Sequence, residues 1–166
     1  MMEYEKTYLA KGLPEDLDDH ESYVMVDVYF PKDSKHPVLR LRRKGNSYEL
    51  TKKEPVGDDK SHQEEHTIPL TKEEFDALAQ VDGKRLEKRR YLYDDMEIDV
   101  FEGDLKGLVL VDKEFGSMEE LNDFTMPDFC LADVSQEEFI AGGMLCGKRY
   151  EDIAGDLERF GYTPIG

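Results

Sequence analysis

The sequence predicts a mainly β protein of the α+β class, with an eight-stranded antiparallel β-barrel and a few flanking helices. Eight short segments are rich in Val, Tyr, Leu and Ile, turn residues separate most of them, and polar residues alternate with apolar ones along them. The 166 residues contain no linker or internal repeat. We therefore expect a single domain over residues 1–166.

The eight strands are expected in chain order, joined largely by short connections that favour antiparallel neighbours. Lys44-Gly45-Asn46 is typical of a hairpin turn, and Gly57-Asp58-Asp59 marks a second turn. The predicted strands are Glu3–Leu9, Tyr23–Phe30, Val38–Arg43, Ser47–Lys53, His62–Ile68, Arg85–Leu92, Met96–Phe101 and Leu108–Phe115.

Helices are predicted from their start signals. Thr71-Lys72-Glu73-Glu74 has the form of a capping box, and the form recurs at Ser117-Met118-Glu119-Glu120 and Ser135-Gln136-Glu137-Glu138. A last helix is expected from about Tyr150 to Phe160, with Gly161 as its C-terminal stop. Residues 127–166 are thus expected to form a C-terminal helical segment.

Composition excludes some classes of protein. A net charge of −17 argues against a general nucleic-acid binder, and no apolar run approaches the length of a membrane span. The N-terminus begins with charged residues rather than a signal peptide. Cys130 and Cys146 lack metal-ligand spacing and are expected as reduced thiols. A soluble cytoplasmic protein is the expectation.

Charge is distributed unevenly along the chain. Thirteen of the twenty-two Lys and Arg residues lie between Val38 and Arg90. Between Leu92 and Gly142, two basic residues stand against fifteen Asp and Glu. This distribution suits either a solvated surface or an anion site with carboxylates left to hold a metal.

Alternation along the strands bears on that choice, because residues two apart share a face. A solvated outer face would explain this alternation in any one strand. The same alternation in six strands favours charged residues that face a wet barrel interior, with apolar residues outside. Such an interior needs a charged ligand and cations. The sets that share a face are Glu3, Glu5 and Thr7; Arg40 and Arg42; Thr51 and Lys53; Lys88 and Arg90; Glu97 and Asp99; and Asp112 and Glu114.

The residue types in these sets indicate the ligands. Carboxylate oxygens suit Mg²⁺ or Mn²⁺, and guanidinium and ammonium groups suit phosphate oxygens. The carboxylates are Glu3, Glu5, Asp112 and Glu114, and the cations are Arg40, Arg42, Lys53, Lys88 and Arg90. Together they predict a polyphosphate ligand bound with a divalent metal.

Several motifs in this order resemble the CYTH, or triphosphate tunnel metalloenzyme, superfamily. They are Glu3-Tyr4-Glu5, Leu39-Arg40-Leu41-Arg42, Tyr48-Glu49-Leu50-Thr51-Lys52-Lys53, Glu65 before Ile68, Leu86-Glu87-Lys88-Arg89-Arg90-Tyr91, Glu97-Ile98-Asp99-Val100-Phe101 and Leu110-Val111-Asp112-Lys113-Glu114-Phe115. The resemblance runs from Glu3 to about Phe115 and implies an eight-stranded antiparallel tunnel.

The resemblance also implies roles for individual residues. Lys53 and Glu5 would be catalytic, with Lys53 orienting or activating a metal-positioned water that attacks the terminal phosphoryl group. Glu3, Glu5 and Glu114 would hold the principal metal, Glu65, Asp99 and Asp112 a second ion or its waters, and Arg40, Arg42, Lys53, Lys88 and Arg90 the triphosphate.

The chain departs from the family pattern in its cations. Thr7 stands where a lysine is expected, and Gln63 where an arginine is expected. A basic residue expected before the final helix is missing unless Lys148 or Arg149 supplies it. Losing these charges would weaken the grip on the terminal phosphate.

Two classes of function therefore remain open. The first is a metal-dependent triphosphatase, a phosphoanhydride hydrolase acting on inorganic triphosphate, thiamine triphosphate or a nucleoside triphosphate. The second is a catalytically weakened module that binds a polyphosphate or organophosphate; adenylyl cyclase activity ranks lower. We expect a small triphosphate or polyphosphate as partner, no nucleic acid or membrane, and a monomer or homodimer.

Overall fold

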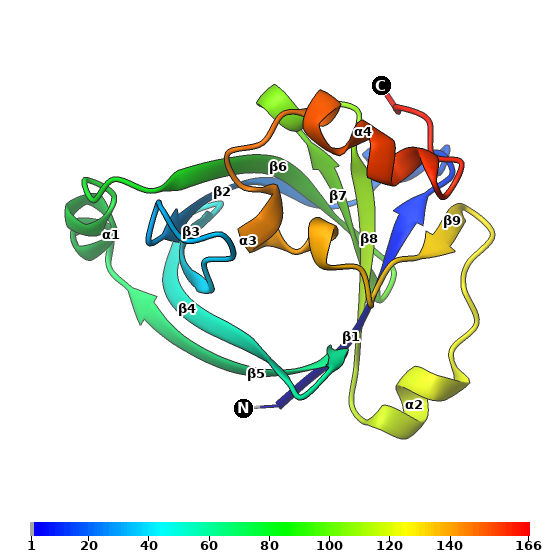
Figure 1. The fold of residues 1–166 in the computed structure, drawn as a ribbon, viewed down its shortest axis with the longest axis horizontal. Helices are drawn as coiled ribbons and strands as arrows, with labels where there is room; N and C mark the ends of the chain where they lie inside the picture. Colours follow the sequence, from blue (N-terminus) through cyan, green and yellow to red (C-terminus); the bar gives the residue numbers. More distant parts are fainter. Residues whose placement is uncertain (1) are drawn as a thin grey trace.

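The computed structural model describes residues 2–166, which form a closed β-barrel with short helices around it (Figure 1). Each of the eight predicted strands overlaps one observed strand, so the predicted fold class is confirmed. The strands are β1 (Met2–Ala10), β2 (Ser22–Phe30), β3 (Leu39–Lys44), β4 (Ser47–Val56), β5 (Asp59–Leu70), β6 (Lys84–Tyr93), β7 (Met96–Phe101), β8 (Val109–Phe115) and β9 (Cys130–Asp133).

The barrel has the neighbour order β5-β4-β3-β2-β6-β7-β8-β1, with every neighbouring pair antiparallel. It closes because β1 pairs with β8 on one edge and with β5 on the other, where Glu3 faces Gln63. The two predicted turns contain Gly45 and Gly57, whose positive φ angles of 58° and 65° suit glycine. The additional strand β9, which the sequence did not predict, pairs with the C-terminal part of β1.

The interior of the barrel changes from charged to apolar along its axis. Towards the start of β1 and the end of β8, its walls carry acids and bases. Towards the other end they carry Leu86, Phe101 and Leu110, which belong to one core with Ile153 and Leu157 of the C-terminal segment. Helices α3 (Gly142–Leu145) and α4 (Tyr150–Glu158) thus cover an apolar end of the barrel (Figure 1).

The outer face of the barrel is apolar where other segments cover it. Tyr8, Ile98 and Val111 point away from the interior and form a second core, against which Phe124 and Phe129 pack. Apolar residues therefore lie outside and charged residues inside, as the alternation along the strands predicts.

Two capping predictions are confirmed. Thr71 and Glu74 form a reciprocal capping box at α1 (Lys72–Leu78), and the Ser117 hydroxyl accepts from the Glu120 amide at α2 (Met118–Asp123). α4 ends at Glu158, just before Gly161, whose φ is 75°. None of the helices in residues 2–166 combines the length and hydrophobicity needed to span a membrane.

The prediction of a helix starting at Ser135 is wrong. The Ser135 hydroxyl accepts a hydrogen bond from the Thr7 amide at 2.9 Å and so ties this segment to β1 instead of capping a helix. The first helix after Ser135 is the short 3-10 helix η3 (Glu138–Ile140). Two other 3-10 helices, η1 (Leu17–Asp19) and η2 (Gly103–Leu105), lie earlier in the chain.

Replacing Leu157 by Ala should lower the free energy of unfolding by about 2–5 kcal/mol, because Leu157 is fully buried in the core that closes the barrel. Leu13→Ala is the matched control, since Leu13 is 42% exposed, and should change stability by about 0.5 kcal/mol or less. Urea unfolding measures both. Equal effects would show that the C-terminal segment does not stabilise the barrel.

Candidate functional site

A cavity of about 330 Å³ lies inside the barrel, and its walls contain every residue that the sequence analysis proposed for the site. Thr7, Thr51 and Glu97, which share faces with those residues, line it as well. The solvated outer face considered as an alternative is therefore wrong for these six strands. The proposed residues are Glu3, Glu5, Glu65, Asp99, Asp112 and Glu114, with Arg40, Arg42, Lys53, Lys88 and Arg90.

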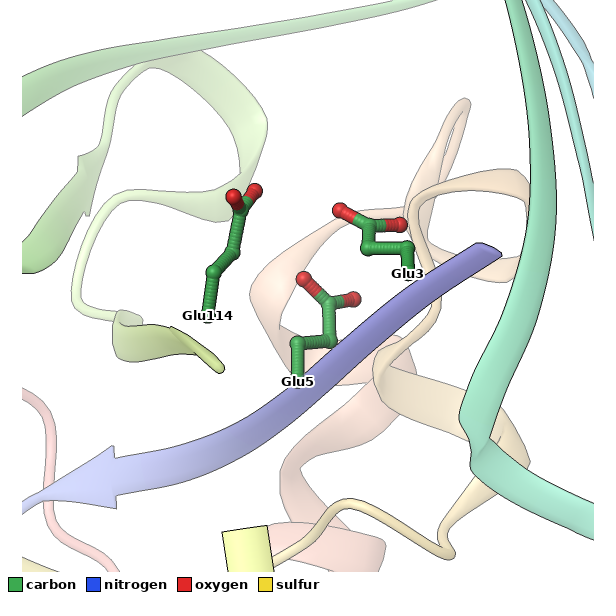
Figure 2. A group of neighbouring side chains, drawn as sticks. All are labelled: Glu3, Glu5 and Glu114. Carbon is green, nitrogen blue, oxygen red and sulfur yellow. The ribbon is translucent and has the colours of Figure 1, made fainter. Parts of the chain in front are cut away.

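Three carboxylates converge at the charged end of the cavity. Glu3 and Glu5 project from the same face of β1, and Glu114 lies directly across from Glu5 in the pairing of β1 with β8. One oxygen from each of the three lies within 4.8 Å of the others, and Figure 2 shows the three side chains pointing toward one another. This cluster matches the donor set that hard divalent cations prefer.

Lys53 of β4 lies against the same cluster. Its Nζ is 2.8 Å from Glu3 Oε2 and 3.0 Å from Glu5 Oε1. Burial and the charge of Glu5 raise the pKa of Glu3 to about 8, although Lys53 opposes that shift. One ammonium group thus serves two carboxylates, with Glu114 beside them. The cluster retains an excess of negative charge, so its residues fit a divalent metal.

Asp112 lies beside this cluster, and no cation of the described residues 2–166 lies closer to it than 3.8 Å. Thr7 donates a hydrogen bond from its hydroxyl to Asp112 Oδ1 at 2.9 Å, and the nearest basic atom, Arg90 Nη2, is 3.8 Å away. Burial and the charges of Glu5 and Asp99 raise the pKa of Asp112 to about 7. Since Thr7 is neutral, it satisfies one oxygen of Asp112 but supplies no charge.

Asp99 on β7 is held by two cations from β6. It accepts hydrogen bonds from Arg90 Nε and Nη2 at 2.8 and 2.9 Å, and Lys88 Nζ lies 2.7 Å away. Burial opposes its charge, but Lys88 and Arg90 hold the pKa of Asp99 well below its usual range. Both oxygens of Asp99 are therefore engaged by cations.

Asp27 on β2 was missed by the sequence analysis. It lies across from Arg42 in the pairing of β2 with β3 and accepts from Arg42 Nε and Nη2 at 2.7 and 2.8 Å. Burial opposes its charge, but Arg42 lowers the pKa of Asp27 to about 2. The signal was present in the sequence, because Asp27 interrupts the apolar run 24–30 and shares a face with Tyr29.

Arg40 is the most weakly paired of the five cations. Its closest carboxylate is Glu49, at 3.8 Å, and its buried Nε has no hydrogen-bond partner within residues 2–166. Its guanidinium therefore has donors available for a ligand in the cavity. Glu65 lies on β5, two strands away from Arg40, and accepts a hydrogen bond from the Thr67 hydroxyl at 2.8 Å.

The residues considered as replacement cations lie elsewhere. In the part of the chain that the structure describes, neither Lys148 nor Arg149 lines the cavity, and Arg149 pairs with Glu151 on the surface. Two lysines that the sequence analysis did not assign, Lys44 and Lys60, do line it. Lys60, which precedes Ser61 on β5, belongs to no sequence motif that would have indicated a role in the site.

The fold and the site define a class of protein: a closed antiparallel barrel whose interior carries a carboxylate cluster beside arginines and lysines. The family model of the CYTH domain matches residues 2–121, and the chain belongs to this family. A curated relative, "Inorganic triphosphatase" of Nitrosomonas europaea, is 29% identical over 144 residues, covering 83% of this chain and 92% of that protein.

Solved structures agree with this assignment. The crystal structure of the inorganic triphosphatase NE1496 superposes with a TM-score of 0.58 at 26% identity, covering 86% of this chain and 93% of that one. A second crystal structure of NE1496, described as a hypothetical protein, gives the same TM-score and identity over 96% of its chain.

Magnesium should stabilise the folded protein more strongly at pH 8.5 than at pH 5.5. Folding raises the pKa of Glu3 from 4.5 to about 8, so protonation of Glu3 stabilises the folded state. This stabilisation is complete below pH 4.5 and is lost as the pH rises through 8. A bound cation stabilises the ionised form instead. At a hundredfold excess over its Kd, it should raise Tm by about 5–10 °C.

Thermal unfolding of three proteins, each with and without Mg²⁺ across this pH range, tests the assignment. Glu3→Gln should lose most of the pH-dependent gain. Glu54→Gln should keep it, because the exposed Glu54 pairs with Lys52 outside the cavity. A gain that is the same at both pH values, or that survives in Glu3→Gln, would contradict the assignment.

Proposed function

We propose that this protein is a metal-dependent triphosphatase that hydrolyses a triphosphate-bearing small molecule inside its barrel, with inorganic triphosphate as the first candidate. The observation that carries this proposal is the convergence of Glu3, Glu5 and Glu114 beside a cation-lined wall of the same cavity. The relative named an inorganic triphosphatase, similar over most of both chains, supports it.

The proposed metal site consists of Glu3, Glu5 and Glu114, with Asp112 and Glu65 available to a second ion or its waters. All of these donors are carboxylate oxygens, which suit Mg²⁺ and Mn²⁺ alike. A divalent ion held there would neutralise phosphate oxygens and lower the pKa of a bound water.

The cations would bind the phosphate chain. Arg40 has unengaged donors facing the cavity, and Lys88 and Arg90 are held in place by Asp99. Fixed positive charges stabilise the negative charge that grows on the leaving oxygen when the terminal P–O bond breaks. Lys53, beside the carboxylate cluster, would orient the attacking water.

A binding module without efficient catalysis is the second candidate, favoured by two neutral residues in the cavity wall. Thr7, a neutral residue where the family pattern has lysine, satisfies Asp112 through its hydroxyl, and Gln63 is neutral where the pattern has arginine. The cavity thus holds fewer cations for a terminal phosphate. The two candidates share a ligand class and differ only in turnover.

Turnover of inorganic triphosphate should require both Mg²⁺ or Mn²⁺ and Glu5. Phosphate release from inorganic triphosphate, ATP and thiamine triphosphate would rank the substrates. Glu5→Ala should lower kcat by a factor of about 10³ or more, because one metal ligand is lost. Glu54→Ala, an exposed change on β4, is the control and should leave the rate unchanged.

Two results would contradict this proposal. A kcat that is unchanged in Glu5→Ala would exclude the proposed metal site. A folded wild type that releases no phosphate from any of the three, yet gains thermal stability from triphosphate, would identify the binding module.

A further inference from the structure

Two fully buried aspartates lie in the wall that carries the cations. Asp27 and Asp99 are each 1% exposed, and each is held by an arginine through two parallel hydrogen bonds. Asp27 does not line the cavity, whereas its partner Arg42 does. Asp27 therefore sits behind the surface that a ligand would contact.

The bond pattern between Asp27 and Arg42 fixes the guanidinium plane. Arg42 uses Nε and Nη2 on one edge to grip both oxygens of Asp27, at 2.7 and 2.8 Å. Nη1, and the second hydrogen of Nη2, remain for other acceptors. A bidentate arginine–carboxylate pair constrains direction as well as distance, so Asp27 determines which edge Arg42 presents.

The charge of Asp27 acts on the wall as well. Arg42, Arg40 and Lys88 all stabilise its ionised form, so Asp27 lies within the field of three of the five proposed phosphate-binding cations. Without it, these cations would repel one another in a site largely shielded from water. Asp27 thus cancels one positive charge of a wall that would otherwise bind any polyanion more tightly.

We propose that Asp27 is a positioning residue for the reaction inside the barrel. It fixes the guanidinium edge that Arg42 presents to the phosphate chain, and it limits the positive charge of the wall so that the diphosphate product is released. This inference rests on the proposed function and adds to it a residue behind the contact surface that governs orientation and product affinity.

A purely structural role for Asp27 predicts a different result. If the pair served only to fill the wall, removing its charge would leave Arg42 buried and uncompensated and would lower stability. The kcat of the remaining folded protein for triphosphate would stay the same. A positioning role instead predicts opposite effects on affinity and turnover. Phosphates bind more tightly because the wall gains net positive charge, and kcat falls because Arg42 is no longer aligned.

Asp27→Asn and Asp27→Glu test the two effects separately. Isothermal titration with pyrophosphate and Mg²⁺ gives product affinity, and phosphate release from inorganic triphosphate gives kcat and KM. Asp27→Asn should bind pyrophosphate about threefold to tenfold more tightly and lower kcat at least tenfold. Asp27→Glu, which keeps the charge but moves the carboxylate, should lower kcat and leave pyrophosphate affinity within about twofold.

Asp95→Asn is the matched control, because Asp95 pairs with Lys113 on the outer surface, and it should change neither quantity. Unchanged pyrophosphate affinity in a folded Asp27→Asn overturns the inference. If Asp27→Asn does not fold, unchanged kcat in Asp27→Glu overturns it. A wild type that neither binds nor hydrolyses triphosphate overturns the proposed function and this inference together. If the wild type is active, either of the failing results with the Asp27 variants overturns the inference alone and leaves the proposed function intact.

Discussion

Charge pairing inside the barrel is the constraint on which the rest of this structure depends. An isolated ionised side chain in a buried wall is costly, and removing one partner of a buried pair typically costs about 3–5 kcal/mol. The chain meets this constraint by placing acids and bases on neighbouring strands: Asp27 faces Arg42, and Arg90 faces Asp99. The strand register that closes the barrel is therefore also the register that pairs the opposite charges in its interior.

The pairing is incomplete at one place, and that place defines the site. Deep in the wall, Asp27 and Asp99 are fully engaged by cations. At the charged end, Lys53 is the one cation of residues 2–166 that pairs with Glu3 and Glu5, while Arg40 on the adjacent strand has a donor with no partner in the same residues. An excess of carboxylate beside an available guanidinium suits a metal and a phosphate bound together better than either alone.

The opposite end of the barrel is closed by apolar packing rather than by charge. α3 packs so closely against the wall that a Cβ at Gly142 would collide with the Tyr29 hydroxyl, and one at Gly143 with the Pro37 carbonyl oxygen. Larger side chains at these two positions would hold the C-terminal segment away from the cavity. The absence of side chains at Gly142 and Gly143 thus allows a close approach of the α3 backbone to the barrel.

Alternation along the strands was enough to predict the barrel and the inward face of its charged residues, since a period of two assigns each side chain to a side. Asp27 was missed because its signal, a single acid that interrupts the apolar run of β2, is not part of a repeating pattern. The helix expected at Ser135 failed because a capping sequence specifies only local bonds, whereas the Ser135 hydroxyl is used by Thr7, 128 residues away. Which strand closes the barrel against β1 is likewise a long-range choice.

A crystal structure of the protein grown with Mn²⁺ and inorganic triphosphate, with anomalous data to locate the metal, would show directly whether the carboxylate cluster and the cations bind their ligands together. We expect Mn²⁺ bound to carboxylate oxygens of Glu3, Glu5 and Glu114 at about 2 Å, with phosphate density against Arg40 inside the cavity. Manganese bound elsewhere, or a cavity that holds neither metal nor phosphate while the outer surface does, would contradict this expectation.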